Sequence, residues 1–472
     1  MTKYFNLLFK TFFSLVVIPG ISVMNLSAQE MWGYANSNYS GIMGLHVNPA
    51  KVVGTPYEFE VNVLGADIFY DNNYLYLPKL SAVNTKTTST EDGTKSNPTT
   101  FVEYTSPGSK HAFVNALVLG PGFIKNKLNH AWAVHSAVRV VASANGVPSA
   151  LTQGFSSGFD YAPLHNKVFR DMKLNAAGMA FAEVGFTYGK VYINRELHWL
   201  AWGATLNGII AFDGMYLHAE AGEYSIPDSS SLYMNHVNLD YGHAFGLGQS
   251  PRGYGGSADL GLVYIHKRVS GGYECGKNAD NKKRYQYKVG LSLIDMGYVN
   301  FSSEAARIRI NDGSLQWSYL DTAKFKSVDD FDRQLSAHSS GDEGANQFGM
   351  ITPAAASLQL DYCLEPRWYA SLSFMQRIPL SNREVYRANS ISFTPRYERS
   401  KFEASLSANM YEYEHVYLGA ALRYSFFVIG TDRLSSFFGS DVRSMDVFFG
   451  FKFNSCMLQK KVSNKGKCPI NG

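Results

Sequence analysis

The chain has 472 residues and a formal net charge of +4 that is spread along its length, which argues against a nucleic-acid-binding protein. Charged residues make up 17% of the sequence, below the level of about 25% that is typical of soluble domains. Tyr (30) and Phe (31) are plentiful, and beyond the first 28 residues no apolar run is long enough to span a bilayer as a helix. This balance is expected of a β-barrel membrane protein.

Residues 1–28 are predicted to be a signal peptide. Lys3 and Lys10 supply the positive region, residues 12–24 supply a short apolar stretch, and Ala28 ends a plausible cleavage site. The alternative is a retained membrane anchor, but the apolar stretch is too short and too broken for a spanning helix. No Cys follows the cleavage region, so no lipoprotein signal is present.

Residues 29–56 lack the alternation of a strand, and we interpret them as an irregular N-terminal segment that contains Asn48-Pro49-Ala50. Pro49 makes a central strand improbable on chemical grounds, because proline cannot donate to a sheet ladder. The apolar side chains of the segment must be covered, and the barrel interior is the nearest cover. We therefore predict a plug-like position inside the barrel. The alternative is a periplasmic arm that docks on a partner.

Residues 57–453 are predicted to form an antiparallel up-and-down β-barrel in a membrane. Alternation begins at Tyr57–Ala66 and sharpens from Ala354 onward, where for example Leu406 and Ser407 fall on opposite faces. The last strand, Asp446–Phe453, has one purely apolar face. In lipid an open sheet edge leaves backbone groups without hydrogen bonds, so this strand must pair with the first one.

The strand count is expected to be about 14, with 12–16 allowed, and an even count places both termini in the periplasm. In that topology the segment 301–353 faces the periplasm, although connections there are usually short. The residues after the last strand, 454–472, form a basic periplasmic tail.

Several segments between the clear strands are expected to be irregular. Residues 79–110 and 146–174 are predicted to be loops, the second with one helical turn, and Gly253–Gly256 is predicted to be a turn. Asn311-Asp312-Gly313 predicts a small hairpin within Arg307–Tyr319. The acidic stretch Val328–Ala337 predicts a short helix.

A secreted β-sandwich is the soluble alternative, since its strands also alternate. Two observations favour the membrane barrel. The inward positions are small and polar, unlike those of a packed soluble core. Aromatic residues near strand ends suit the girdles that lie at membrane interfaces. These residues are Trp368, Tyr397, Tyr411, Tyr413 and Tyr417.

No catalytic, cofactor or metal site is predicted. The cysteines form no CxxC or Cys/His spacing, and Gly253–Gly256 lacks the strand–helix context of a phosphate loop. Five histidines lie on different strands without a Ser or Asp at triad spacing. They are His135, His198, His243, His266 and His415. Inward charged residues either pair across a filled lumen, which we favour, or line a pore. They are Arg139, Glu183, Asp259, Lys288, Glu403 and Arg423.

Two disulfides are possible in an exported protein. Cys456 and Cys468 lie in the tail, where a bond between them closes a short periplasmic loop. Cys275 and Cys363 fall at one outer rim in the expected topology.

Several stretches together carry a resemblance to a known group of proteins. They are the end of the signal peptide at Ala28-Gln29, Asn48-Pro49-Ala50, Gly256–Leu262, Leu291–Gly297 and Cys468-Pro469. The chain resembles outer-membrane barrels of Bacteroidota related to the FadL-type long-chain fatty acid transporters. That group includes the PorV and PorP/SprF-like barrels of type IX secretion and a large family of unknown function, which Cys468-Pro469 matches best. The resemblance covers nearly the whole mature chain, and it implies a plug at residues 29–56.

The sequence therefore predicts a non-enzymatic barrel in the outer membrane of a Gram-negative bacterium. Its expected partners are outer-membrane lipid and a small solute, with a hydrophobic molecule as the expected class. The alternative is a structural or interaction barrel that serves type IX secretion or surface assembly, with secretion-system proteins as partners. A lumen filled by side chains and the N-terminal segment, with no apolar pocket, would favour the alternative.

Overall fold

The structure is a computed structural model. It describes residues 30–78, 102–103, 108–127, 129–152, 162–245, 250–267, 285–318, 327–340, 342–438, 441–455 and 457. The predicted signal peptide, most of the predicted 79–110 loop and nearly all of the basic tail lie outside the described residues. Within the described ranges, no helix is both long and apolar enough to cross a membrane.

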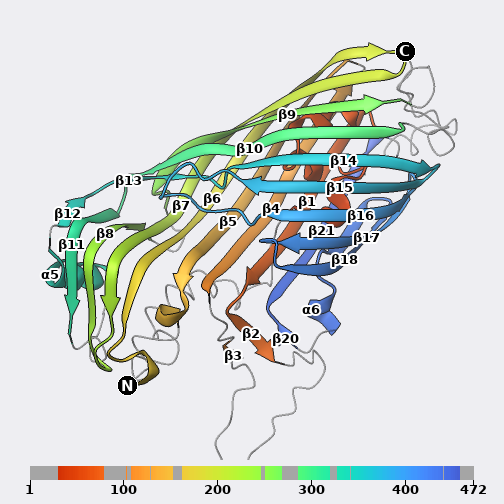
Figure 1. Ribbon diagram of the computed structural model, residues 1–472. Helices are drawn as coiled ribbons and strands as arrows, with labels where there is room; N and C mark the ends of the chain where they lie inside the picture. The colour runs from red at the N-terminus through yellow and green to blue at the C-terminus, as the bar shows by residue number, and fades with distance from the viewer. Residues whose placement is uncertain are drawn as a thin grey trace, which may run out of the picture.

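Fourteen antiparallel strands of the described chain close into a transmembrane barrel (Figure 1). In order around the ring they are β1 (Phe59–Asn72), β4 (Ser109–Lys127), β5 (His130–Pro148), β6 (Val168–Arg195), β7 (His198–Ser225), β9 (Gly253–His266), β10 (Tyr287–Phe301), β14 (Ala355–Glu365), β15 (Trp368–Arg377), β16 (Ser390–Glu398), β17 (Phe402–Tyr411), β18 (His415–Tyr424), β19 (Phe427–Thr431) and β21 (Ser444–Asn454). β21 pairs with β1, with Phe453 opposite Val61. The predicted strand number and the closure of the last strand on the first are confirmed.

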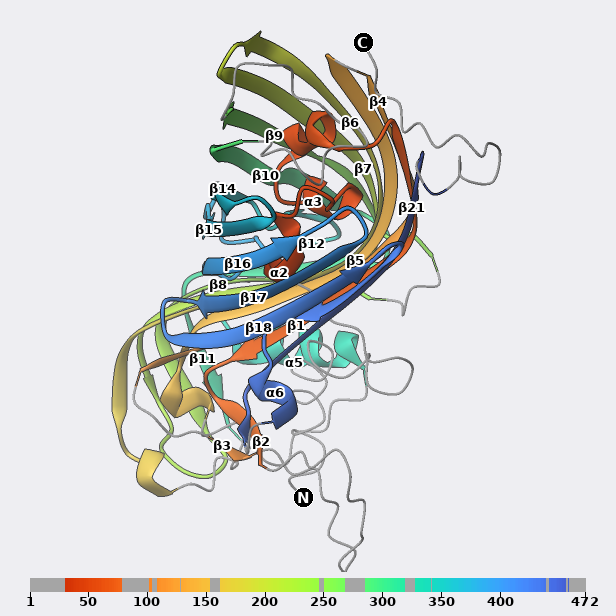
Figure 2. The same ribbon diagram turned by 90° about the vertical axis from the view of Figure 1, so that its right-hand side faces the viewer.

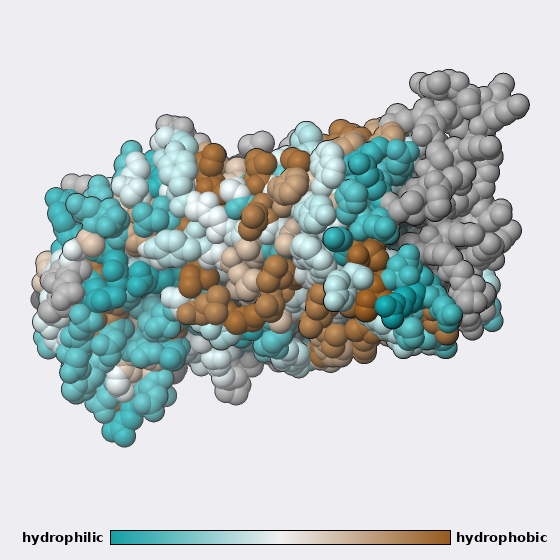
Figure 3. Space-filling view, turned by 90° about the horizontal axis from the view of Figure 1, so that it is seen from above, coloured by the Kyte–Doolittle hydropathy of each residue, from teal (hydrophilic) through white to brown (hydrophobic). Residues whose placement is uncertain are grey.

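The wall is apolar outside and polar inside. On β17, Leu406 is 62% exposed whereas Ser407 is 2% exposed, and on β6 Val184 is 62% exposed beside Glu183 at 3%. Hydrophobic side chains gather across the middle of the surface, and hydrophilic ones dominate the end at the left of the view (Figure 3). Soluble proteins rarely expose apolar bands of this kind, so this band is the lipid-facing surface.

Aromatic side chains lie around the end of the barrel where β1 begins and β21 ends, here called the proximal end. The pairs include Trp368–Tyr397, with ring centroids 5.1 Å apart, and His266–Tyr287 at 5.0 Å. Such rings are typical of a membrane interface.

Two predicted girdle residues are wrong. Tyr411 is 2% exposed and points into the lumen, because its position on β17 has the parity of the inward residues. Tyr417 of β18 also has the inward parity, and its ring lies 3.9 Å from the guanidinium of the buried Arg433.

At the opposite, distal end the sheet continues beyond the membrane. β6 and β7 have 28 residues each, far more than the roughly ten that a tilted membrane strand needs. Their distal halves carry β8 (Leu232–Ala244), which pairs with β11 (Ala305–Trp317), and β11 pairs with β12 (Asp342–Ala345). Helix α5 (Val328–His338) packs against this sheet, and we call the assembly the distal domain.

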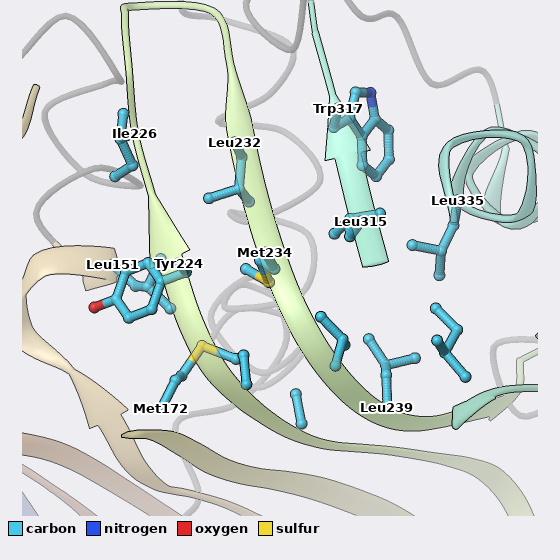
Figure 4. Close-up of a cluster of buried hydrophobic side chains, with 14 of the residues drawn as sticks. Leu151, Met172, Tyr224, Ile226, Leu232, Met234, Leu239, Leu315, Trp317 and Leu335 are labelled. Carbon is cyan, nitrogen blue, oxygen red and sulfur yellow. The ribbon is translucent and has the colours of Figure 1, made fainter. Parts of the chain in front are cut away.

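The distal domain has its own hydrophobic core, part of which is drawn in Figure 4. Leu335 of α5 joins Trp317 and Leu315 of β11, and Met234 and Leu239 of β8. A hydrogen bond of 2.8 Å between His243 Nε2 of β8 and Asp332 Oδ2 of α5 holds the helix against the sheet. In the distal domain the apolar side chains are therefore buried against one another, whereas on the wall they face lipid.

Three predictions for the middle of the chain are wrong. Gly253–Gly256 is the start of β9, which pairs with the proximal half of β7, whereas β8 pairs with the distal half and belongs to the distal domain. Counting both as strands of the wall shifted the topology, so the segment 301–353 lies at the distal end, not the proximal one. Asn311-Asp312-Gly313 is an irregularity within β11, with Asp312 at φ 45°, and no hairpin. The predicted short helix is α5 and is confirmed.

Short elements complete the described fold. They are α2 (Trp32–Ala35), α3 (Ile42–Leu45), η1 (Pro49–Gly54), β2 (Leu75–Pro78), β3 (Val102–Glu103), η2 (Ala162–Leu164), β13 (Phe348–Ile351), α6 (Ser435–Phe438) and β20 (Asp441–Val442).

Candidate functional site: the lumen

The N-terminal segment, of which residues 30–54 are described, lies inside the ring of strands (Figure 2). Its prediction as irregular backbone is wrong, since it folds into α2, α3 and η1. Trp32 and Ala50 are completely buried, and Ile42 is 1% exposed. Apolar residues that lack strand periodicity are thus covered by the wall rather than forming part of it.

The start of α2 is anchored to the wall by one carboxylate. The backbone N–H groups of Trp32 and Gly33 donate to Asp432, at 2.7 Å and 3.0 Å, and Ser405 Oγ donates to the Gly33 carbonyl. The first N–H groups of a helix lack partners within the helix, so a carboxylate placed there satisfies them. Sequence patterns could not reveal this bond, because its partners are 400 residues apart.

The turn after α2 is bonded to charged side chains of β16 and β17. Ser37 Oγ donates to Glu403 at 2.7 Å, and Asn38 Nδ2 donates to Glu398 at 3.0 Å. Lys452 of β21 donates to the Tyr39 carbonyl. The segment is therefore held from several sides of the ring by polar contacts.

The predicted motif residues Asn48, Pro49 and Ala50 form the start of η1. Asn48 Oδ1 accepts from the Ala50 N–H at 3.0 Å and so caps the helix, and Pro49 occupies the first position, where its missing N–H costs nothing. Asn48 Nδ2 donates to the Leu262 carbonyl at 3.1 Å and to Gln359 Oε1 at 3.0 Å. One side chain thus joins the segment to β9 and β14.

The motif packs against a part of the wall that is formed by glycines. A Cβ atom added to Gly203 of β7 would lie 2.6 Å from backbone atoms of Pro49 and Ala50, and one added to Gly261 of β9 would meet Asn48. Both glycines face inward on adjacent strands. The backbone of the segment therefore approaches the backbone of the wall directly.

We expect Gly203→Ala to destabilise the protein by about 1–3 kcal/mol, because the added methyl overpacks the contact with Pro49 and Ala50. Gly208→Ala on the same strand is the matched control, since a Cβ there meets nothing within 4 Å. Denaturant unfolding of the two variants in detergent micelles checks this. Equal stability of the two variants would show that the motif does not pack closely against Gly203.

Inward charged residues pair within the lumen, which confirms the favoured interpretation. Arg139 of β5 donates to Asp295 of β10 at 2.7 Å and lies 3.7 Å from Glu183. Other pairs are Arg423–Glu403 at 3.1 Å, Lys288–Asp361 at 3.4 Å and Arg396–Asp361 at 2.8 Å. Buried charges persist only when they are paired and hydrogen-bonded. Both partners of each pair belong to the wall, although Ser37 of the segment also donates to Glu403.

A small cavity of about 30 Å³ lies where the segment meets Asp295. Its lining residues are Glu30, Met31, Met43, His46, Val47, Asp67, Asn115, Leu117, Arg139, Asp295 and Arg387. One water needs roughly 10–15 Å³ by this measure, so the cavity has room for about two waters. At this place the described part of the segment packs closely against the wall.

The other predicted site residues are not brought together. Cys363 is buried near the proximal end of β14, and its Sγ donates to the Glu365 carbonyl at 3.3 Å. Its proposed partner Cys275, and the pair Cys456 and Cys468, lie outside the residues whose side chains are described. Within the described part of the chain, no group of three or more His, Cys, Asp or Glu side chains could hold a metal ion.

The chain was compared with known families and structures. A family model described as a family of unknown function (DUF5723) matches residues 49–432. No protein of curated function matches the sequence.

Solved structures with a similar outline include the TodX deltaS2S3 mutant monoaromatic hydrocarbon channel, at 11% identity and TM-score 0.42, covering 88% of this chain and 95% of that one. The Pseudomonas putida toluene transporter TodX has 11% identity and TM-score 0.32, covering 91% and 97%. A Pseudomonas aeruginosa FadL homologue has 10% identity and TM-score 0.22, covering 91% and 97%. The overlap is partial, and the strand pairing of the chain itself defines its fold.

Proposed function

The chain belongs to the DUF5723 family of unknown function, and we propose that it is an outer-membrane channel for a small hydrophobic solute. At rest, the N-terminal segment closes the channel as a plug. The plug must leave its place, at least in part, before the solute passes.

The observation that carries this proposal is a lumen filled by a separable segment. Eight strands already make a barrel that side chains alone can fill, so fourteen strands enclose more space than a solid structural barrel needs. The segment joins the wall only at its end near Gly54, and its other contacts are noncovalent. It can therefore move without breaking the ladder of any strand.

The solute class is supported by the wall beneath the segment. Met31 and Met43 cover a patch of inward apolar side chains, Leu119, Val428 and Phe448, each no more than 1% exposed. If the segment moves, this patch faces the lumen and offers a hydrophobic solute a surface. The flexible methionines suit a contact that forms and separates.

Uptake measurements in a Gram-negative host test the proposal. Cells that make the chain should take up a radiolabelled alkylbenzene faster than cells without it, while uptake of a small sugar should be unchanged. The variant Gly33→Cys/Ala421→Cys can pin the segment. A Cβ on Gly33 would lie 3.0 Å from the Ala421 Cβ, so the two backbones must separate by about 0.5 Å to reach the roughly 3.5–4.5 Å of a disulfide. The oxidised form of this variant should lose the increase in alkylbenzene uptake, and reduction should restore that increase.

The wild type under the same oxidant is the control for the thiol chemistry. Alkylbenzene uptake equal to that of cells without the chain would refute the solute class. Equal uptake by the oxidised and reduced cysteine variants would refute displacement of the segment.

An interaction barrel is the second candidate, and two observations favour it: the filled lumen and the distal domain with its own core. Such a barrel conducts nothing, with or without the segment. The conductance measurement described in the Discussion separates the two.

A further inference from the structure

The connection between β15 and β16, residues 378–389, is folded into the barrel, and we call it the inner loop. Glu384, Val385 and Ala388 are each 1% exposed, unlike residues of an ordinary surface loop. We propose that the inner loop is a second closure of the lumen, acting from the distal side and latched to the N-terminal segment by Arg387. This inference rests on the proposed channel function.

The inner loop crosses the lumen. The Tyr386 N–H donates to Ser143 Oγ of β5 at 2.8 Å, although β5 lies six strands from β15 around the ring of fourteen. Asn175 of β6 donates to the Asn382 carbonyl at 3.0 Å. Val385 packs in a cluster with Phe181 and Phe301. The loop therefore spans the barrel just below the distal domain.

Arg387 joins the inner loop to the N-terminal segment and to the wall. Its guanidinium donates to Glu30 at 2.6 Å and also to Asp295, the carboxylate that Arg139 holds from the other side. Ala388 packs in one cluster with Trp32 and Ala35 of α2. The two lumen elements thus share a charged contact and an apolar one, so movement of either disturbs the other.

The other end of the inner loop is attached to the distal domain. Arg383 lies 3.5 Å from Asp240 of β8, and Arg307 donates to the same carboxylate at 2.8 Å. Burial raises the pKa of Asp240, but hydrogen bonds from Arg307 and Tyr216 outweigh it and hold the pKa below its ordinary value. The carboxylate is therefore ionised and can hold Arg383. Contacts run from the distal domain through the loop to the segment.

Planar-bilayer recordings test the second closure. In a protein that lacks Met31–Lys51, replacing 380–388 by Gly-Ser-Gly should raise the single-channel conductance several-fold above that of the deletion alone. In the full-length chain, Arg387→Gln should make open events several-fold more frequent. Arg252→Gln is the matched control, because Arg252 is also a buried arginine at the distal end and pairs with Glu304, which lies outside the inner loop, at 2.6 Å. Heat modifiability on gels shows that each variant is folded.

The outcomes separate the two proposals. If the shortened loop adds nothing to the deletion, and Arg387→Gln behaves as Arg252→Gln, the inner loop is not a closure and the channel proposal stands. If the deletion, the shortened loop and their combination all fail to conduct, the channel proposal itself is wrong. Should the shortened loop not fold, Arg387→Gln in the deletion background must raise the conductance, and no rise would overturn the second closure.

Discussion

Replacing Leu406 by Arg is expected to cost about 2–4 kcal/mol of stability in a bilayer, because the new charge faces lipid near the middle of the membrane. Leu406 is 62% exposed, stands in the middle of β17, and lies opposite Ala420 of β18. Lipid cannot hydrate a guanidinium at that depth, and the neighbouring outward positions offer no carboxylate. Denaturant-dependent refolding into lipid vesicles measures the loss.

Leu364→Arg is the matched control for this change. Leu364 is 52% exposed but lies at the proximal rim, one residue before β14 ends, where the cost of an arginine falls to about 0–1 kcal/mol. An inward position such as Ser407 is a poor control. It is 2% exposed and packed near Asp432, so an arginine there would overpack the lumen. Equal losses at Leu406 and Leu364 would argue against the assigned lipid face.

The wall could be predicted from the sequence because the alternation of apolar and polar residues is visible within each strand. Alternation separates Leu406 from Ser407 residue by residue, and the need to close an edge in lipid pairs β21 with β1. Glycine signals were less reliable. Gly253–Gly256 and Asn311-Asp312-Gly313 are typical of turns, yet here they allow a strand to begin or to change register.

The lumen could not be predicted in detail because its contacts join distant parts of the chain. Parity predicts that Arg139 faces inward, but it would place Asp295 outward, on the same face as Leu293. The register shift after Leu293, where Asp295 has φ 54°, turns Asp295 into the lumen, where it meets Arg139. The inner loop likewise has the polar composition of a surface loop, and only the structure shows Arg387 beside Glu30. For residues 29–56, the uncovered apolar side chains predict a place inside the barrel, and Trp32, Ile42 and Ala50 of the described part are buried.

Deleting Met31–Lys51 is expected to leave a folded barrel and to open it. Both partners of the lumen pairs Arg396–Asp361, Arg423–Glu403 and Arg139–Asp295 belong to the wall, so they can stay paired without the segment while the emptied lumen fills with water. The deletion removes the side chains that now occupy the space between β9 and β17. Heat modifiability on gels checks that the barrel has formed.

Single-channel conductance in planar bilayers is the measurement that tests the plug most directly. It is recorded for the wild type and for the deletion, each with the native and with the shortened inner loop. The wild type should remain closed, and the deletion should conduct ions at least about tenfold better, as expected when a lumen filled by protein becomes filled with water. Conductance that the deletion leaves unchanged with either loop would contradict the plug and the channel, and would favour the interaction barrel.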